Sequence, residues 1–386
     1  MHKYFCTTIY YLKKYSNILL LINISVRYTM SKRSILEEII LFLIHRYNGE
    51  RTVQGILYLL KGKQSAQIIQ DSHFYNVTSF FGLFPFLTQQ TMQNIINGLE
   101  NIGYIKASEH KNTYLLNKNG LAYIENQNLQ FKEFTFINGL RFSSIQKNFW
   151  KRFSLFFQTI SNLNMNQKYF RAVNQDYDIQ EWVKNVILNF GGKKTELVNC
   201  FYEDLHKTLM NLSDDDALLF VKRLSGANAY GMTLEQIASE NNESVETIYI
   251  KSINILHQIL TNLIENKLDY PFLSKFVQGE KSTNITNTSI ETKRLFAEGK
   301  TIQEIASIRN LKLSTIEDHI VECVLSDELF PIEQFITPIQ YSLIKNKIIE
   351  LNTRKLKMVK EDLLNEVSYF QIRITLARMG DLHGPK

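Results

Sequence analysis

The front of the chain alternates between helix-type hydrophobic spacing and short polar breaks. "SILEEIILFLIH" begins with a Ser cap, has acids in its first turn and then apolar residues at period 3.6, which predicts a helix from Ser34 to about His45. A second helix is predicted over "TVQGILYLLKG", ending at Gly62, and a loop over "DSHFYNVTSFFGLFP". Thr88 is the predicted cap of a third helix, "TQQTMQNIINGLENIG", which Gly103 ends.

The pattern then changes to a period of two. "YIKASEHKNTYLLNKNGLAYI" alternates apolar and polar residues around a polar turn, which predicts a short β-hairpin. Three helices followed by a hairpin is the order of a winged helix, and "LENIGYIKA…TYLLNKNG" resembles the recognition-helix-and-wing passage of that family. We therefore predict a winged-helix-like domain over 30–126, with its wing from Ser108 to Asn112. Lys106 and Lys111 are candidate phosphate contacts, and the alternative is a winged helix used only for protein contacts.

Aromatic residues dominate the next region, 127–212, which we predict to be helical. Phe149, Phe153, Phe156 and Phe157 recur at helical spacing, as core residues do. Interleaved cations leave a second interpretation open, a stacking platform for single-stranded nucleic acid. Gly191 interrupts this region and predicts the end of a helix.

The clearest signal in the chain is an internal repeat. "GMTLEQIASENNESVETIYI", from Gly231, aligns without a gap with "GKTIQEIASIRNLKLSTIEDH", from Gly299. In the second copy Thr301 and Glu304 have the spacing of a capping box, and Ser314 is the predicted cap of the following helix. Each copy therefore predicts a helix-turn-helix, in which the second helix is set to lie in a groove. The first belongs to a domain over 213–268 that resembles region 4 of sigma-type factors, and the second to a domain over 284–380.

The letters "GKT" at the start of the second copy suggest a nucleotide-binding loop, but the spacing excludes one. A Walker A loop needs a glycine five residues before Gly299, where this chain has Arg294. The preceding "TSIETKRLFAEG" indicates a capped helix and not a strand. Thr301 is therefore predicted to cap a helix, and Lys300 to face solvent.

Charge around the two second helices is mixed, so their ligand stays open. In the second copy Lys312 and His319 are the candidate donors among several acids, and in the first copy Lys251 stands against two glutamates. Acids on a groove-facing helix repel phosphate, although they can accept from cytosine. Further candidate phosphate contacts follow in "YSLIKNKIIELNTRKLKMVKE": Lys345, Lys347, Arg354, Lys355, Lys357 and Lys360. A solvated helix face is the alternative for this segment.

The composition of the chain indicates its structural class but says little about its chemistry. The chain of 386 residues is 44% hydrophobic with few glycines (16) and prolines (5), which favours a mainly α, multi-domain protein. Its net charge is +6, but residues 1–29 carry four of those charges and no acid, so global charge says little about DNA. That leader is expected to be a start-site extension or a disordered tail, with an export or membrane signal as the alternative. Three scattered cysteines, including Cys323, fit a reducing cytoplasm.

Candidate catalytic chemistry is sparse. The eight histidines form no HxH or HxxxH pair, and the cysteines form no CxxC pair. "SDDD" at 213–216 is more simply a helix cap with acids at the positive end of the helix dipole than a magnesium site. We expect no catalytic residues, no metal, no cofactor and no small-molecule substrate.

The C-terminal region carries a family likeness. "TSIETKRLFAEGKTIQEIASIRNLKLSTIEDHI" and the later "LLNEVSYFQIRITLARM" resemble the helix-turn-helix domain at the C-terminus of some RecQ-type DNA helicases. The whole chain resembles the YpbB-like proteins of low-GC Gram-positive bacteria, stand-alone carriers of that domain. The chain departs from the helicases in having no Walker A loop, helicase motifs or cysteine zinc cluster.

The resemblance implies a non-catalytic DNA-binding accessory protein that acts in recombination or repair with a RecQ-type helicase as partner, which would supply the ATPase. Two other functions stay open. One is a protein-interaction scaffold whose helix-turn-helix units never touch bases. The other is a sequence-specific transcription regulator, which would need groove-facing donors that the acidic helices do not obviously supply.

Overall fold

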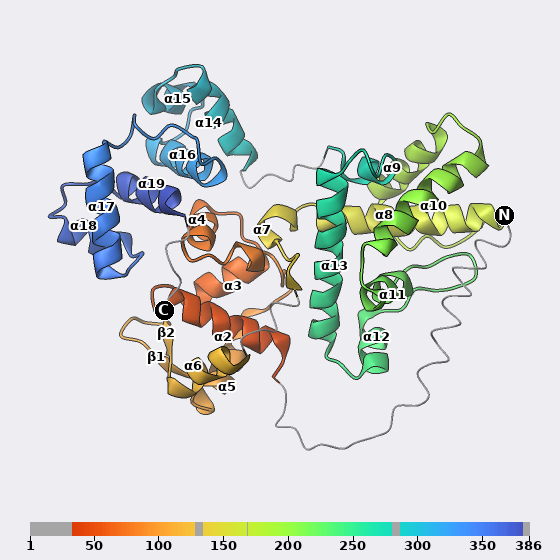
Figure 1. The fold of residues 1–386 in the computed structure, drawn as a ribbon, viewed down its shortest axis with the longest axis horizontal. Coiled ribbons are helices and arrows are strands. Elements are labelled where there is room, and N and C mark those ends of the chain that lie inside the picture. Colours follow the sequence, from red (N-terminus) through yellow and green to blue (C-terminus); the bar gives the residue numbers. More distant parts are fainter. Residues whose placement is uncertain (1–32, 128–133, 168, 280–285, 381–386) are drawn as a thin grey trace. The chain divides into compact units, whose positions relative to one another are not determined.

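The computed structural model describes residues 33–127, 134–167, 169–279 and 286–380 (Figure 1). In these ranges the protein is mainly helical with one two-stranded hairpin, as the composition and periodicity predict. The chain divides into two compact units, one formed around residues 154–255 and the other by 36–153 together with 256 onward. The predicted leader, 1–29, lies outside the described residues. No helix in the described part of the chain is long and apolar enough to cross a bilayer.

The second of these units begins with the region predicted to be winged-helix-like. Its elements are α2 (Ile35–Tyr47), α3 (Val53–Lys61), α4 (Ala66–Phe74), the 3-10 helix η1 (Thr78–Phe80), α5 (Gln89–Asn101), β1 (Ile105–Ala107), β2 (Tyr114–Leu116) and α6 (Lys118–Gln127). The predicted first, second and third helices are confirmed, with Gly62 in the left-handed conformation after α3 and Thr88 capping α5. The predicted loop "DSHFYNVTSFFGLFP" is wrong in part, because its first residues belong to α4 and η1 lies within it.

The predicted hairpin is confirmed, and the structure adds its register. Ile105 pairs with Leu116 and Ala107 with Tyr114 in an antiparallel ladder. Asn112 adopts φ 59° at the turn, a left-handed conformation that asparagine tolerates better than most residues. Its carbonyl oxygen accepts a hydrogen bond of 3.0 Å from the N–H of Val53, so the wing tip is held against the start of α3.

The aromatic region forms α7 (Gly139–Phe142), α8 (Gln146–Asn164), α9 (Tyr177–Leu188) and α10 (Lys194–Met210). Phe149, Phe153 and Phe156 are buried, which confirms the core interpretation of the stripe for these three residues. Gly191 has φ 71° in the break between α9 and α10, as its predicted role at a helix end requires.

The predicted domain over 213–268 forms α11 (Asp214–Lys222), α12 (Leu234–Asn241) and α13 (Val245–Glu265), of which α12 and the start of α13 are the first repeat copy. Ser213 caps α11 by accepting from the N–H of Asp216, so the "SDDD" stretch is the predicted cap. Thr233 and Gln236 close a capping box at α12. The two helices predicted for the first copy, α12 and α13, are therefore present.

The C-terminal part returns to the unit that holds the winged helix. It contains η3 (Leu273–Val277), α14 (Asn287–Ala297), α15 (Ile302–Ile308), α16 (Leu313–Ser326), α17 (Pro338–Leu351), α18 (Leu356–Asp362) and α19 (Tyr369–Met379). Helices α4, α16 and α19 of this unit pack against one another (Figure 1). Sequence segments almost 250 residues apart, such as Gln70 and Asp318, are thereby in hydrogen-bond contact.

Candidate nucleic-acid interface

The second helix-turn-helix is built by local capping. Thr301 Oγ1 accepts from the N–H of Glu304, while a Glu304 carboxylate oxygen lies 2.8 Å from the N–H of Thr301. Asn310 has φ 51° at the turn, matching Asn242 (φ 53°) in the first copy. The predicted cap of the next helix at Ser314 is wrong: α16 begins at Leu313, with Lys312 in the capping position and no side-chain cap. "GKT" is thus the start of a helix, and Lys300 is exposed.

One face of α16 is fixed against α14 by a buried glutamate. Glu322 accepts from the N–H of Thr286 at 3.1 Å, the Thr286 hydroxyl at 2.8 Å and the Ser289 hydroxyl at 2.7 Å. The carboxylate therefore satisfies donors at the first turn of α14 and is itself satisfied, as a buried charge requires. These hydrogen bonds hold α14 against α16, the second helix of the helix-turn-helix.

His319, a predicted nucleic-acid contact, points to the same interior. Its exposed fraction is 7%, and its Nδ1 lies 2.9 Å from Thr292 Oγ1 and 3.2 Å from Arg309 Nη1. Burial, helped by the positive charge of Arg309, lowers the pKa of His319. In this structure the ring is a neutral core residue and does not face a groove.

The acidic face of α16, which left its ligand in doubt, is occupied within the chain. Arg373 of α19 lies 3.3 Å from Glu317 and forms an ion pair with Asp318. Gln70 of α4 donates a further hydrogen bond of 3.2 Å to Asp318. Desolvation raises the pKa of Glu317, and the charge of Arg373 opposes that rise. The polar face that a groove-reading helix needs is therefore covered by α19 and α4.

Several of the predicted phosphate-binding cations have partners within the chain. Lys251 pairs with Glu243, Lys347 with Glu350 and Asp362, and Lys357 with Glu361. Lys360 lies over the ring of Tyr369, and Arg354 over the ring of Tyr75. An exposed ion pair such as that of Lys357 exchanges readily with solvent, so its pairing reduces the attraction for phosphate without abolishing it.

The remaining predicted cations divide by exposure. Lys106, Lys111 and Lys312 are exposed, while Lys345 and Lys355 are half-buried. Lys106 lies on β1 and Lys111 at the wing tip, so these two share one hairpin. Among the described residues, no acid forms an ion pair with either of them.

The structure adds a face that the sequence interpretation overlooked, the outer side of α5. Met92, Ile96 and Leu99 are buried and anchor the helix. The opposite side exposes a row of carboxamides: Gln89, Gln90, Gln93, Asn94 and Asn97. The signal was present in "QQTMQNIIN", but a search for cations passes over neutral side chains.

A lysine lies at the N-terminal end of this helix. Lys61 Nζ donates to the carbonyl oxygen of Leu87 at 3.0 Å, next to the capping residue Thr88. Its ammonium group and the positive end of the helix dipole are therefore close together. The hairpin with Lys106 and Lys111 follows the other end of α5 directly.

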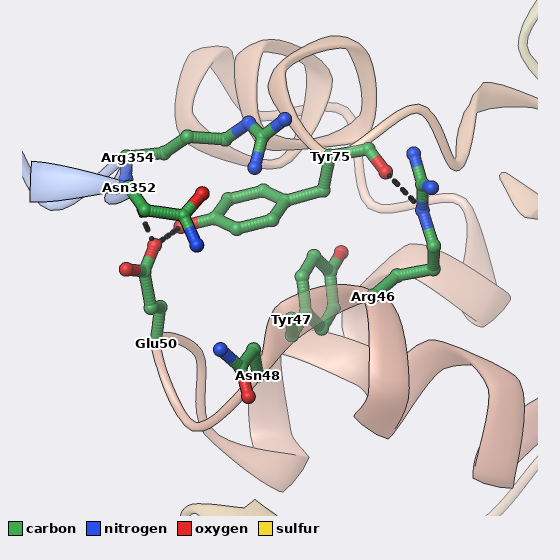
Figure 2. Close-up of a pocket in the computed structure, with 7 residues that line it drawn as sticks. All are labelled: Arg46, Tyr47, Asn48, Glu50, Tyr75, Asn352 and Arg354. Carbon is green, nitrogen blue, oxygen red and sulfur yellow. Dashed lines mark hydrogen bonds between the residues drawn. The ribbon is translucent and has the colours of Figure 1, made fainter. Parts of the chain in front are cut away.

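A small polar cavity lies in the same unit, between the α2–α3 turn and the α17–α18 turn. Figure 2 shows that the ring of Tyr75 crosses it, with Arg354 on one side and Tyr47 on the other. The Glu50 carboxylate accepts from the Tyr75 hydroxyl, the Thr353 hydroxyl and the N–H of Arg354. The Arg46 side chain donates to the carbonyl oxygen of Tyr75 at 2.9 Å.

This cavity has room for little. Its volume is about 20 Å³, enough for one water molecule. Glu50 thus connects two turns of the unit by hydrogen bonds and is not part of a ligand site. No cluster of three metal-ligating side chains occurs in the ranges that the structure describes.

Comparison with known proteins agrees with the C-terminal motif. Residues 288–376 match the family described as "Helix-turn-helix domain". The chain is 27% identical to "Protein YpbB" of Bacillus subtilis (strain 168) over 334 residues, which is 86% of this chain and 94% of that protein. No solved structure matches it significantly. The resemblance to YpbB-like proteins is thus confirmed: the chain is similar to Protein YpbB over most of its length and has a helix-turn-helix domain near its C-terminus.

Proposed function

We propose that this protein is a non-catalytic DNA-binding accessory protein that acts with a RecQ-type helicase in recombination or repair. The observation that carries the DNA-binding part is the helix-turn-helix domain at 288–376. A second helix-turn-helix in the other unit and a winged-helix-like part with an exposed basic hairpin support it. Elements of these three kinds are typical of DNA-binding proteins.

We expect exposed cations to make most of the contacts between the protein and the DNA phosphates. Lys106, Lys111, Lys312 and Lys357 are the predicted contacts that are exposed, and Lys345 and Lys355 are accessible in part. Of the four exposed lysines, Lys357 is in an ion pair with Glu361. Binding through such side chains releases counterions from the DNA, so affinity falls steeply as salt rises.

A salt series tests the DNA-binding part. The full chain is titrated with duplex, forked and single-stranded DNA at several salt concentrations, and the slope of log affinity against log salt is measured. Lys106→Glu with Lys111→Glu should weaken binding to every sequence and reduce the slope by about 2, roughly one per lost phosphate contact. Lys184→Glu with Lys267→Glu is the matched control, since both lysines are exposed and outside the proposed contacts. No binding at low salt would sink the proposal.

The helicase part rests on the family resemblance alone and needs its own measurement. Purified RecQ-type helicase is assayed for ATP-driven unwinding of forked DNA with and without this protein. A change in unwinding rate that Lys106→Glu with Lys111→Glu abolishes and the control variant keeps supports cooperation on DNA. No change in rate and no co-elution would reject the partnership while leaving DNA binding intact.

One observation favours a second candidate, a protein-interaction scaffold. The acidic face of α16, which a groove-reading helix would need, is bound within the chain by Arg373 and Gln70. Ile339 and Leu343, four residues apart on α17, are exposed at 83% and 44%. Co-elution with the helicase in the absence of any DNA affinity would favour the scaffold.

A further inference from the structure

The outer face of α5 differs from a general phosphate-binding surface. The helix contains no lysine or arginine, and Glu100 near its end is its one charged residue. Instead it presents six exposed carboxamides: the five described above, over the first nine of its 13 residues, and Asn101 at its end. Solvated helix faces are normally mixed in charge, so a neutral face of this kind suits a ligand that offers neutral donors and acceptors.

These side chains are oriented by one another. Gln90 donates to Asn94 at 2.9 Å, and Gln93 donates to Asn97 at 2.9 Å. Such bonds link successive turns of a helix and narrow the rotamers of the exposed amides. The buried Met92, Ile96 and Leu99 hold the opposite side in the core, so the polar face is carried on a fixed helix.

The chemistry of the face selects a base. A carboxamide places one donor beside one acceptor, and adenine presents N7 as acceptor and N6 as donor in the major groove, so asparagine or glutamine can bind it with two hydrogen bonds. Guanine offers two acceptors there and is read by arginine or lysine, which α5 lacks. The major groove is wide enough to admit an α-helix.

Cations lie at both ends of this face. Lys61 is held at the carbonyl oxygen of Leu87, before the first turn of α5, and Lys106 and Lys111 lie on the hairpin that follows the last turn. Phosphate contacts of this kind fix the register of a protein on duplex without reading sequence. Specificity and attraction are therefore divided between neutral amides and flanking lysines.

We propose that the outer face of α5 reads adenines in the major groove of A·T-rich duplex DNA. The inference rests on the proposed DNA-binding function and adds to it the reading helix, the groove and the base. It also assigns sequence reading to α5 rather than α16, whose polar face is covered by α19 and α4.

The experiment compares the full chain on three short duplexes of equal length: one A·T-rich, one G·C-rich, and the A·T-rich duplex with every adenine replaced by 7-deazaadenine. That analogue loses the N7 acceptor but keeps base pairing and the minor-groove edge. The protein should bind the A·T-rich duplex most tightly, and roughly tenfold of that affinity should be lost for each adenine contact that 7-deazaadenine removes.

Asn94→Ala with Asn97→Ala is the test variant. It should bind all three duplexes alike, at the affinity of the wild-type protein for the G·C-rich duplex. Asn185→Ala with Asn199→Ala is the matched control, since it makes the same exchange at exposed helical positions of α9 and α10 and should keep the wild-type preference. Asparagine to alanine on an exposed helix face favours the helix, so both variants are expected to fold.

The outcomes separate the two proposals. Equal affinity of the wild-type protein for all three duplexes overturns adenine reading and leaves DNA binding standing. A preference for A·T that 7-deazaadenine does not weaken assigns the preference to the minor groove or to DNA shape and also overturns it. A preference that survives in the α5 variant overturns the assignment to this helix. No binding to any duplex overturns the proposed function and, with it, this inference.

Discussion

Helices α5 and α16 make an instructive pair. Each follows a shorter helix, each has a buried apolar side, and each occupies the place of a groove-reading helix in its motif. On α5 the polar side is open to solvent and carries neutral amides. On α16 the polar side carries acids that Arg373 and Gln70 already bind. The two helices differ in whether neighbouring helices cover the polar side, and the hydrophobic pattern of a helix does not encode this.

The difference has consequences for stability. Substitutions in α16 should mainly unfold the protein, and those on the outer face of α5 should mainly change its ligand. Five predictions, from the largest effect to the smallest, can break or sharpen this contrast.

The core side of α16 should give the largest effect. Ile320 is fully buried, so Ile320→Ala removes buried methyl groups and leaves a cavity, at a cost of about 2–5 kcal/mol. Ile308→Ala is the matched control: Ile308 is 57% exposed on α15 and should change stability by roughly 0.5 kcal/mol or less. Urea unfolding of both variants measures the difference. Equal shifts would show that α16 is not the structural helix of the pair.

The polar side of α16 should come next. Arg373→Met leaves the carboxylates of Glu317 and Asp318 without their ion-pair partner in a half-buried position, which should cost roughly 1–3 kcal/mol. Arg294→Met, at an exposed arginine that pairs with Glu291 and Glu298, should cost at most about 1 kcal/mol. A larger loss of stability for Arg294→Met than for Arg373→Met would contradict the inference that Arg373 covers the acidic face of α16.

The same arginine predicts a pH dependence. Desolvation raises the folded-state pKa of Glu317, so protonation of this group favours the folded state, and that stability is lost as pH rises through the folded pKa. Without Arg373 the pKa should rise further. The stability deficit of Arg373→Met should therefore shrink as pH falls from 7 towards the usual glutamate range. Adding Glu317→Gln should weaken this pH dependence, and a deficit that grows on acidification would count against the arrangement.

Helix caps should have smaller and similar effects in both motifs. Thr301→Ala at α15 and Thr88→Ala at α5 each remove a side-chain acceptor for an unpaired N–H, at a cost of about 1 kcal/mol. Thr195→Ala is a control, because Thr195 is exposed in the first turn of α10 and its neighbour Lys193 occupies the capping position. Thermal unfolding compares the three. If Thr301→Ala left stability unchanged, the capping box would not stabilise the motif.

The smallest stability effect is expected on the outer face of α5. Asn94→Ala with Asn97→Ala should leave the unfolding midpoint unchanged or raise it slightly, since alanine has a higher helix propensity by a few tenths of a kcal/mol. The same variant should lose the adenine preference. A substantial loss of stability here would mean that the amide ladder supports the fold rather than a ligand.

Much of the local structure was predictable because its causes are local. Thr88, Gly62 and the capping box at Thr301 act within a few residues, and the hairpin follows from a period of two. Helix α4 was missed because "DSHF" is polar and lies in a stretch rich in turn formers. The cap at Ser314 was misplaced because α16 begins one residue earlier, without a side-chain cap.

The candidate interface was less predictable. Counting cations identified Lys106, Lys111 and Lys312, which are exposed, but also His319, which is buried. Pairing of Lys347 with Asp362 and stacking of Arg354 on Tyr75 depend on where other elements pack. These contacts join residues far apart in the chain, so spacing alone gives no sign of them.

The amino-acid sequence by itself determined the helical class, the repeated helix-turn-helix and the winged-helix order, because periodicity, caps and turns are interactions between near neighbours. Only the tertiary structure decided which surfaces remain for a partner. The packing of α4 and α19 on α16 half-buries the acids of one candidate reading face, while α5 keeps its carboxamides in solvent. Accessibility is a property of the folded unit, because it depends on distant segments that compete with the ligand for the same polar groups.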